Sequence, residues 1–439
     1  MHIFKYLLII PLLVVLSANA QDSILTKRDA VDIALENNYD IKIAEGNLES
    51  AKNSASIYNS AYLPSLTASA GANYNIDDNL TDFQDGTSQE VRGAKTSALF
   101  GSLEVNYTVF NGLGRKYNYE KLKENFNLSE LQSRQVIENS ILNLFTVYYE
   151  VARLTQNVNS QVETMSISKK RLLRAQYGFD YGRNTKLDVL NAEVDFNNDS
   201  IKYLNLRQEL ENVKRDINVL LGRDVNTGFQ VDTGLVFTEG LKLGILMDQA
   251  MNNNVAVLQE QAFLKTAEYD ININRSNLIP RLGLSASYDY NKRFYDQTSI
   301  YKKQTTYGPT LSANLSWNIF DGGSTRVRMQ NSKIALENQQ ISLDQTKQVL
   351  QRNVNNAWGV YQNSRFVLEA EQKNLETSQR NFDRTLEQQN LGQITSIEFR
   401  QAQQNLLNTH INFNNAKYTA KIAELALLKL SGELMNAEF

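Results

Sequence analysis

The sequence predicts a mixed α and β fold in which short strand hairpins alternate with very long helices. Three observations lead to this prediction. The chain contains an internal two-fold repeat, four of its segments alternate apolar and polar residues with a period of two, and long stretches are free of proline. Because such strands have one apolar and one polar face, we expect a sheet that lies between two different environments.

The internal repeat runs through strand, turn and helix patterns alike. Val109-Phe110-Asn111-Gly112 recurs 210 residues later as Ile319-Phe320-Asp321-Gly322. Upstream of these motifs the offset is 216 residues, as it is between Pro64 and Pro280. A duplicated unit of roughly 200 residues explains a register that is kept through such different patterns. The predicted parts are a signal peptide at 1–20, a first repeat at 21–222, a connecting segment at 223–240, a second repeat at 241–432 and a C-terminal tail at 433–439.

The period-two segments form one predicted hairpin in each repeat, at 64–111 and 280–321. The last strand of the first hairpin alternates an apolar set, Leu103, Val105, Tyr107 and Val109, with a polar set, Ser102, Glu104, Asn106 and Thr108. Strands of about 10 to 12 residues suit a tilted membrane-spanning strand. The last strand of the second hairpin is expected to continue through Trp317 and Ile319. A soluble antiparallel sheet with one wet face would show the same alternation.

The polar connections of the two hairpins, 76–98 and 292–308, are expected to be long exposed loops. They are rich in Asp, Thr, Ser, Gln and Lys, and the change of offset between the repeats falls in the first of them.

The N-terminus has the features of a secretory signal peptide. An apolar run from Leu7 to Leu16 follows Lys5, and Ala18 and Ala20 form an A-x-A cleavage site. A run of about 10 apolar residues is short for a transmembrane helix, which needs about 20. We therefore expect an exported protein that begins after residue 20, with a membrane anchor as the alternative.

The composition argues against several classes of protein. A net charge of −3 and 21% charged residues do not suit a nucleic-acid partner, which attracts a basic face. The chain has no cysteine, so disulfide and thiolate chemistry are excluded. Its two histidines, His2 and His410, offer little for metal or acid–base chemistry. We expect neither enzymatic activity nor a cofactor.

The remaining sequence favours two pairs of helices, at 114–221 and 324–431. Each pair lacks proline and is interrupted near a glycine, Gly182 or Gly392. At about 1.5 Å per residue, the longer helix of each pair would reach roughly 100 Å. In the second helix of the first pair, apolar residues at steps of three and four predict a coiled-coil stripe. This stripe begins with Leu187, Leu190, Val194, Ile201 and Leu204.

One chain offers only four candidate membrane strands. The smallest closed barrels have about eight strands, and an open sheet edge in lipid would leave backbone groups without hydrogen bonds. Several chains must therefore share one barrel. Two chains would give about eight strands around an interior filled by side chains, and three would give about twelve, wide enough to leave a channel.

Several motifs occur in the same order in both repeats. They include Tyr62-Leu63-Pro64, the turns Phe110-Asn111-Gly112 and Phe320-Asp321-Gly322-Gly323, and the tip segments 181–185 and 391–395. In order and spacing, over residues 21 to 435, they resemble the TolC-like outer membrane efflux protein family. The resemblance implies a homotrimer, with a twelve-stranded β-barrel in the outer membrane of a Gram-negative bacterium and a long α-helical coiled-coil tunnel in the periplasm.

The resemblance also implies a function. Members of the family are passive exit ducts of tripartite efflux or type I secretion systems. They dock onto a periplasmic adaptor (membrane fusion) protein and an inner-membrane pump. A periplasmic coiled-coil adaptor or structural protein is the alternative, because it would share the long helices, although it would lack the duplicated hairpins.

The helical tips contain the first group of candidate functional residues. Gly182 and Gly392 permit the positive φ that a reversing chain needs, and Thr185 and Thr395 suit the N-caps of the returning helices. The resemblance adds a role in adaptor docking for these residues and for Arg183.

A carboxylate follows each of these threonines by three residues, as Asp188 and Glu398. In a trimer such carboxylates would form rings of like charge at the periplasmic constriction. They would equally serve as first-turn acids that stabilise the helix N-terminus. The best-known member of the family has a second carboxylate where this chain has Gln401, and an arginine where it has Ile394, so its closed-state latch cannot be carried over. Glu104, on the polar face of a strand, is the candidate for the barrel lumen.

Overall fold

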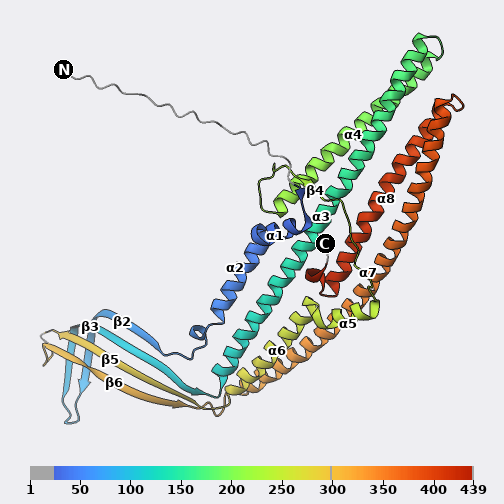
Figure 1. The fold of residues 1–439 in the computed structure, drawn as a ribbon. Helices are drawn as coiled ribbons and strands as arrows, with labels where there is room; N and C mark the ends of the chain where they lie inside the picture. Colours follow the sequence, from blue (N-terminus) through green and yellow to red (C-terminus); the bar gives the residue numbers. More distant parts are fainter. Residues whose placement is uncertain (1–23, 297–298, 438–439) are drawn as a thin grey trace, which may run out of the picture.

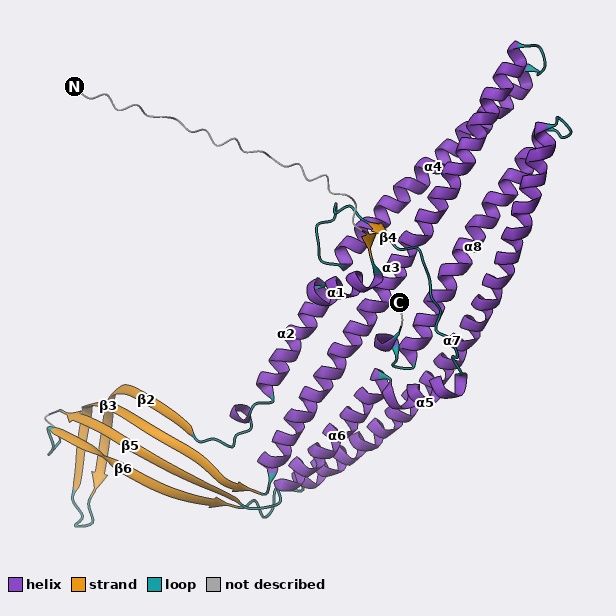
Figure 2. Cartoon of the chain, viewed as in Figure 1, coloured by secondary structure: helices purple, strands orange, loops and turns teal. Residues whose placement is uncertain are grey.

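The computed structural model describes residues 24–296 and 299–437. They form an elongated molecule with a β-sheet at one end and two long helical hairpins that reach the other end (Figure 1, Figure 2). The expected signal peptide at 1–20 and the last two residues of the tail lie outside the described residues. Within the described ranges, no helix combines the length and the apolar composition that crossing a bilayer requires.

The two halves of the chain contain the same large elements in the same order. The first half has β1 (Ile24–Leu25), α1 (Lys27–Asn37), α2 (Tyr39–Ser54), η1 (Ile57–Asn59), β2 (Ser65–Asp82), β3 (Ser88–Asn111), α3 (Gly114–Asp180) and α4 (Lys186–Leu220). The second half has β4 (Gln230–Val231), α5 (Leu243–Asn253), α6 (Val255–Ser276), β5 (Arg281–Tyr295), β6 (Lys303–Ser316), α7 (Ser324–Asn390), α8 (Ser396–Leu430) and η2 (Leu434–Asn436). Helices α3 and α7 both contain 67 residues, and α4 and α8 both contain 35.

The four long strands form one antiparallel sheet in the order β2-β3-β5-β6. Its register aligns the apolar residues of the four strands, as in the row Leu66, Val105, Ala286 and Leu311. The next row along the strands is polar and contains Thr67, Glu104, Ser287 and Thr310. Because side chains alternate between the faces of a strand, the sheet has one apolar and one polar face. Strands β2 and β6 are its two edges.

The first hairpin is longer than the sequence indicated. We expected strands of about 10 to 12 residues and a loop at 76–98. In the structure β2 has 18 residues, β3 has 24, and the two strands pair as far as Asp82 and Ser88. The added part carries polar side chains on both faces, including Asp77, Asn79 and Glu90. The sequence of this part therefore lacks the alternation of apolar and polar residues that predicts a strand. The backbone hydrogen bonds between the two strands form without such an alternation. Likewise, β5 extends to Tyr295 and β6 begins at Lys303, inside the loop expected at 292–308.

The last strand of the sheet ends earlier than expected. Strand β6 stops at Ser316 instead of continuing through Trp317 and Ile319. Ser316 pairs with Arg281, the first residue of β5, and Pro280 before it has no N–H to donate. Trp317 instead donates its indole N–H to the carbonyl oxygen of Leu278 at 3.1 Å. The end of β6 is therefore set by the start of its neighbour.

The short helices are joined to the long ones in the same way in both halves. Asn38 follows α1, and its side-chain Nδ2 donates to the carbonyl oxygen of Leu220 at the end of α4 at 2.8 Å. Asn254 follows α5 and donates in the same way to Leu430 at the end of α8 at 2.9 Å. These bonds satisfy carbonyl groups that a helix end leaves free.

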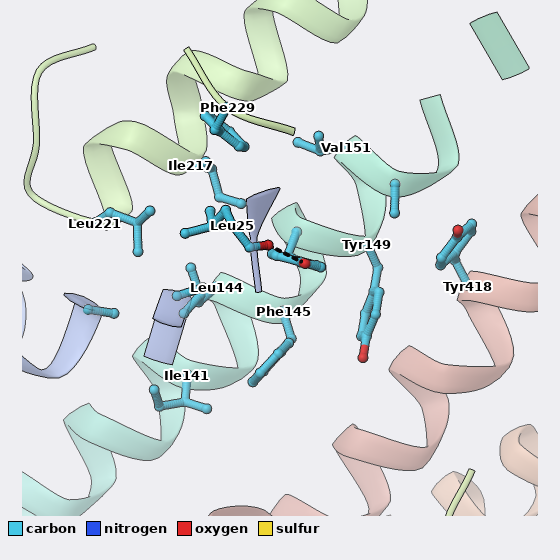
Figure 3. Close-up of a cluster of buried hydrophobic side chains, with 14 of the residues drawn as sticks. Leu25, Ile141, Leu144, Phe145, Tyr149, Val151, Ile217, Leu221, Phe229 and Tyr418 are labelled. Carbon is cyan, nitrogen blue, oxygen red and sulfur yellow. Dashed lines mark hydrogen bonds between the residues drawn. The ribbon is translucent and has the colours of Figure 1, made fainter. Parts of the chain in front are cut away.

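The largest apolar core lies around the middle of α3, where β1, α4, α8 and the segment before α5 meet (Figure 3). Tyr148 is fully buried there, and its hydroxyl donates to the carbonyl oxygen of Leu25 at 2.7 Å and accepts from the N–H of Asp232 at 3.0 Å. Tyr149 packs against Tyr418 of α8, with ring centroids 5.9 Å apart. The core therefore fixes the first hairpin against the second.

The predicted coiled-coil stripe of α4 is exposed over its first part and buried farther along the helix, where Leu210 and Ile217 join the main core. Leu187 is 64% exposed and Ile201 is 56% exposed, and the rest of the stripe up to Leu204 is exposed as well. Helix α4 packs against α3 with another face, which includes Val189 and Ala192. The part of the stripe from Leu187 to Leu204 thus remains available for contacts outside the single chain.

Candidate functional site

The two helical tips lie at the end of the molecule opposite to the sheet (Figure 1). Gly182 and Gly392 both have a φ of +71°, in the left-handed region that favours glycine. The Gly182 N–H donates to the carbonyl oxygen of Phe179 at 2.9 Å, and the Arg183 N–H donates to that of Gly178 at 2.7 Å. This is the Schellman pattern of a helix C-terminus, and the tip at Gly392 repeats it. Both glycines are therefore required by the turn itself.

The returning helices both begin with a capping box. The Thr185 hydroxyl accepts from the N–H of Asp188 at 3.2 Å, and the Thr185 N–H donates to Asp188 Oδ2 at 2.9 Å. Thr395 and Glu398 make the same pair of bonds, at 3.2 and 2.8 Å. The hydrogen bonds from the side chain and backbone of Thr185 hold the pKa of Asp188 below its ordinary value. The backbone and side-chain bonds from Thr395 do the same for the pKa of Glu398.

The predicted constriction residues do not meet within one chain. Asp188 lies at the tip of α3 and α4, whereas Glu398 and Gln401 lie at the tip of α7 and α8. The Gln401 side chain is exposed, and its Nε2 donates to Asn405 Oδ1 at 2.8 Å. Arg183 is exposed at the first tip. One oxygen of each predicted carboxylate is thus engaged in a helix cap, while Arg183 faces solvent.

Apolar packing distinguishes the second tip. Phe382 and Phe399 are buried against each other, with ring centroids 5.6 Å apart, and Ala402 completes the cluster. Ile394 packs against this cluster, as does Ile167 from α3. The residue that stands in place of the family's arginine therefore contributes to the apolar packing of its own hairpin.

A buried polar network behind the tips connects three helices. Arg400 of α8 donates Nη1 and Nη2 to the two carboxylate oxygens of Asp199 on α4, at 2.6 and 2.8 Å. The Ser168 hydroxyl of α3 donates to Asp199 Oδ2 at 2.5 Å. Asp195, one turn before Asp199, pairs with Arg171 of α3 and lies 3.4 Å from Arg400 Nε. The network therefore attaches the second hairpin to the first.

The two positive charges of this network, on Arg171 and Arg400, are balanced by the two negative charges of Asp195 and Asp199. Burial alone would raise the pKa of Asp199, but the hydrogen bonds from Arg400 and Ser168 outweigh it and hold that pKa below its ordinary value. Burial and the neighbouring Arg400 lower the pKa of Arg171 to about 10. Two of the Arg171 guanidinium nitrogens, Nε and Nη1, are buried and have no hydrogen-bond partner in the described part of the chain.

The sequence alone did not reveal this network, because Asp195 and Asp199 stand among many other polar residues of α4. A signal was nevertheless present. Val189, Ala192, Asp195 and Asp199 follow one another at steps of three and four, so the two carboxylates continue the face that the small apolar residues begin. Arg400, on a different helix, can be connected to them only by the tertiary fold.

The sheet at the other end presents two uncovered faces. Leu66 is 71% exposed and Leu311 is 83% exposed on the apolar face. Glu104 lies on the polar face between Thr67 and Ser287, and it is partly exposed. A contiguous exposed apolar surface of this kind marks contact with a partner or a membrane.

A comparison with protein families shows to which family this chain belongs. The family model described as "Outer membrane efflux protein" matches residues 30–223 and 246–433, which include both hairpins of the sheet and both helical tips. This chain belongs to the outer membrane efflux protein family. The resemblance inferred from the sequence is thereby confirmed. As a member of this family, the protein is an outer membrane efflux duct.

The curated relatives within this family are distant in sequence. The outer membrane efflux protein BepC of Brucella suis is 21% identical over 406 residues, which is 91% of this chain and 84% of the relative. The alkaline protease secretion protein AprF of Pseudomonas aeruginosa is 21% identical over 419 residues, which is 93% of this chain and 85% of the relative. The likeness thus extends over nearly the whole chain.

Solved structures share the fold. The CmeC outer membrane channel of Campylobacter jejuni superposes with a TM-score of 0.76 at 18% identity, over 93% of this chain and 86% of that one. The outer membrane protein VceC of Vibrio cholerae superposes with a TM-score of 0.71 at 14% identity, over 92% of this chain and 96% of that one. The mixed fold of sheet and long helices is therefore the fold of known outer membrane efflux proteins.

Proposed function

We propose that three copies of this chain assemble into a duct, with one twelve-stranded barrel in the outer membrane and one helical tunnel in the periplasm. The observation that carries this proposal is the state of the sheet. Strands β2 and β6 each pair with a strand on one side only in the described part of the chain, so the two outer edges of the sheet are open, and its apolar face is uncovered. Pairing β6 of one copy with β2 of the next would satisfy both edges.

The flanks of the helical part support the same arrangement. Figure 1 shows α2 and α4 along one side of the molecule and α7 along the other, with α3 and α8 between them. Ile43 and Ile201 are exposed on the first flank, and Ile334 and Phe366 are exposed on the second. A flank that meets a different flank of the next copy generates a closed ring when the rotation between copies closes, as closure of the barrel would require. In such a ring these apolar residues would be covered.

Within this trimer, the apolar face of the sheet would contact outer membrane lipid and the polar face would line the lumen. Glu104 would then face the lumen and favour cations there. A barrel of about twelve strands is wide enough to leave a channel between its side chains.

The tips would carry the contacts with the rest of the export system. The turns at Gly182 and Gly392, with Arg183, Thr185 and Thr395, form the surface that we assign to a periplasmic adaptor and, through it, to an inner-membrane pump. Asp188, Glu398 and Gln401 would surround the constriction. The relatives include both an efflux protein and a protease secretion protein, so either kind of pump suits this chain.

The network of Arg400, Asp199 and Arg171 would hold the tips in the resting arrangement. It attaches the hairpin of α7 and α8 to that of α3 and α4. Opening the duct requires the hairpins to separate, and removal of Arg400 should favour that separation.

Single-channel recording of the detergent-purified protein in planar bilayers tests the proposal. Wild type should give a small, cation-preferring conductance, Arg400→Ala should give a larger one, and Glu398→Ala should lose part of the preference. Glu193→Ala, an exposed acid on α4, is the matched control and should leave the current unchanged. Folded protein that neither associates with membranes nor forms trimers would contradict the proposed duct.

A further inference from the structure

The apolar face of the sheet changes character toward the end that lies away from the helices (Figure 1). Its rows nearer the helices are apolar, as in the row of Tyr107, Leu284 and Ala313. Farther along the strands follows a row in which Tyr290 of β5 pairs with Tyr307 of β6. Aromatic residues mark the level of the lipid headgroups on outer-membrane barrels. The tyrosine row therefore indicates where the exterior surface of the membrane would lie on this face.

Three lysines lie on this face just beyond the tyrosine row. Lys303 of β6 pairs directly with Phe294 of β5. Lys292 precedes Phe294 by two residues, and Lys95 of β3 precedes Ser97, the partner of Phe294 on that strand, by two residues. Residues two apart on a strand share a face, and diagonal neighbours on paired strands lie about 7 to 8 Å apart. The register therefore gathers the three lysines around one aromatic ring.

The positive charges of these lysines are not neutralised by the chain itself. None of the three forms an ion pair within the described part of the chain. The acids that follow along the same strands have other partners. Asp296 Oδ2 accepts from the Lys95 N–H at 2.8 Å, Asp78 Oδ1 accepts from the Gly93 N–H at 2.6 Å, and Glu90 pairs with Arg92. Even with Asp296 counted, positive charge predominates around Phe294.

The surface beside the lysines is apolar, which favours an amphiphilic ligand over a soluble anion. Leu99 pairs with Lys292 across the strands and is 48% exposed on the same face. Lys292 Nζ itself lies 5.0 Å from the centroid of the Phe294 ring, a cation–π contact. An inorganic phosphate ion would gain nothing from Leu99 or from the tyrosine row, whereas an acyl chain would cover them and leave water.

We propose that Lys95, Lys292 and Lys303 bind the phosphate groups of a phosphorylated lipid in the exterior leaflet of the outer membrane. This inference rests on the proposed function, in which the apolar face of the sheet contacts lipid. The ammonium groups would donate to phosphate oxygens, and the acyl chains would lie along Leu99 and the apolar rows nearer the helices. The ring of Phe294 would hold Lys292 in position. A trimer would carry three such sites, one on each copy.

Native mass spectrometry of the detergent-purified protein, titrated with lipid A that carries two phosphates, tests this site. Wild type should bind one lipid per chain. Replacement of a single lysine by glutamine should raise the Kd about fivefold, and replacement of all three should raise it on the order of a hundredfold. Replacement of all three by arginine keeps the charge and should retain binding. Arg293→Gln, on the opposite face of β5 between Lys292 and Phe294, is the matched control and should bind like wild type.

The chemistry of the ligand can be tested with the same proteins. Lipid A with a single phosphate should bind wild type more weakly, and its Kd should rise less when the three lysines are replaced. Inorganic phosphate at the concentration of the lipid should not displace it. Displacement at equal concentration would overturn the assignment to a lipid. Equal affinity of wild type and the triple glutamine variant for lipid A with two phosphates would overturn the site as a whole.

The outcomes separate this site from the proposed duct. Trimers that conduct ions but bind lipid A equally with and without the lysines would overturn the site and leave the duct intact. A triple glutamine variant that folds but no longer forms trimers would assign the lysines to contacts between copies, which also overturns the site. Wild-type protein that forms no trimers but binds lipid A through the lysines would contradict the duct and support the site.

Discussion

Helices α3 and α4 have the same lengths and the same tip geometry as α7 and α8, yet the two pairs occupy different surroundings. Helices α3 and α8 lie next to each other in the middle of the chain and are rich in buried residues. Helices α4 and α7 lie on the outside and expose apolar residues such as Ile201 and Ile334. The repeated unit thus provides one contact inside the chain, here called the seam, where α3 meets α8. It also provides two outer flanks, along α4 and along α7, and an assembly of several copies requires such flanks.

The seam itself is built from residues that the repeat does not share. Tyr148 of α3 corresponds to Trp358 of α7, and Tyr149 corresponds to Gly359, at the offset of 210. Arg400 of α8 corresponds to Leu190 of α4. Backbone geometry is therefore common to both halves, whereas the buried aromatic and ionic contacts are specific to one.

The largest expected effect concerns the flanks. Ile201→Asp and Ile334→Asp place a charge on an apolar surface that the proposed trimer buries, so each should abolish assembly. Size-exclusion chromatography with light scattering in detergent measures the result. Asn198→Asp, an exposed neighbour on α4, should leave the trimer intact. Trimers formed by both isoleucine variants would refute the flank contact.

The next largest effect is expected when the ion pair between Arg400 and Asp199 is removed. Arg400→Ala leaves Asp199 buried beside α3 without its main cation, which typically costs about 3 kcal/mol or more. Thermal unfolding followed by circular dichroism should show a clearly lower midpoint. Arg384→Ala, an exposed arginine of α7, is the control. An unchanged midpoint for Arg400→Ala would mean that the network is not a stabilising contact.

Two neighbouring tyrosines of the seam should behave differently. Tyr148→Phe removes a hydroxyl that bonds Leu25 and Asp232, leaving the buried Leu25 carbonyl and the part-buried Asp232 N–H without this partner, at a cost of about 1 to 3 kcal/mol. The Tyr149 hydroxyl is buried without a hydrogen-bond partner in the described residues, so Tyr149→Phe should be neutral or stabilising. Chemical denaturation of both variants measures the difference. Equal destabilisation would contradict this assignment.

Replacement of the tip glycine should lower stability by a similar amount at both helical tips. Gly182→Ala and Gly392→Ala both force a side chain into the left-handed region, with nothing within 4 Å of the added Cβ atom. Each should cost about 1 kcal/mol, by the same conformational cause. Differential scanning calorimetry checks whether the two midpoints shift equally. A much larger shift at one tip would show that its glycine has a contact beyond the turn.

The smallest effect is a dependence on pH. The pKa of Asp199 in the folded protein lies below its ordinary value. Its contribution to stability is therefore present above the unfolded pKa of about 4 and is lost as the pH falls through the folded pKa. Acidification below pH 4 should lower the unfolding midpoint of wild type more steeply than that of Asp199→Asn. Parallel curves would mean that another carboxylate dominates.

Local patterns made much of the fold predictable. The helix pairs, the tip glycines and the capping threonines depend on residues close in sequence, and the alternation in β3 and β5 gave the two faces of the sheet. The added length of β2 and β3 and the early end of β6 could not be predicted, because they depend on pairing between strands. The link from Arg400 to Asp199 depends on tertiary packing, and the proposed grouping of Asp188 with Glu398 would require assembly of several chains.

The measurement that tests the central claim most directly is the stoichiometry of the detergent-solubilised protein by native mass spectrometry. We expect three chains per particle, because four strands from each copy close one barrel and the two flanks meet in a ring. Stable folded monomers or dimers, with the sheet edges still unpaired, would contradict it.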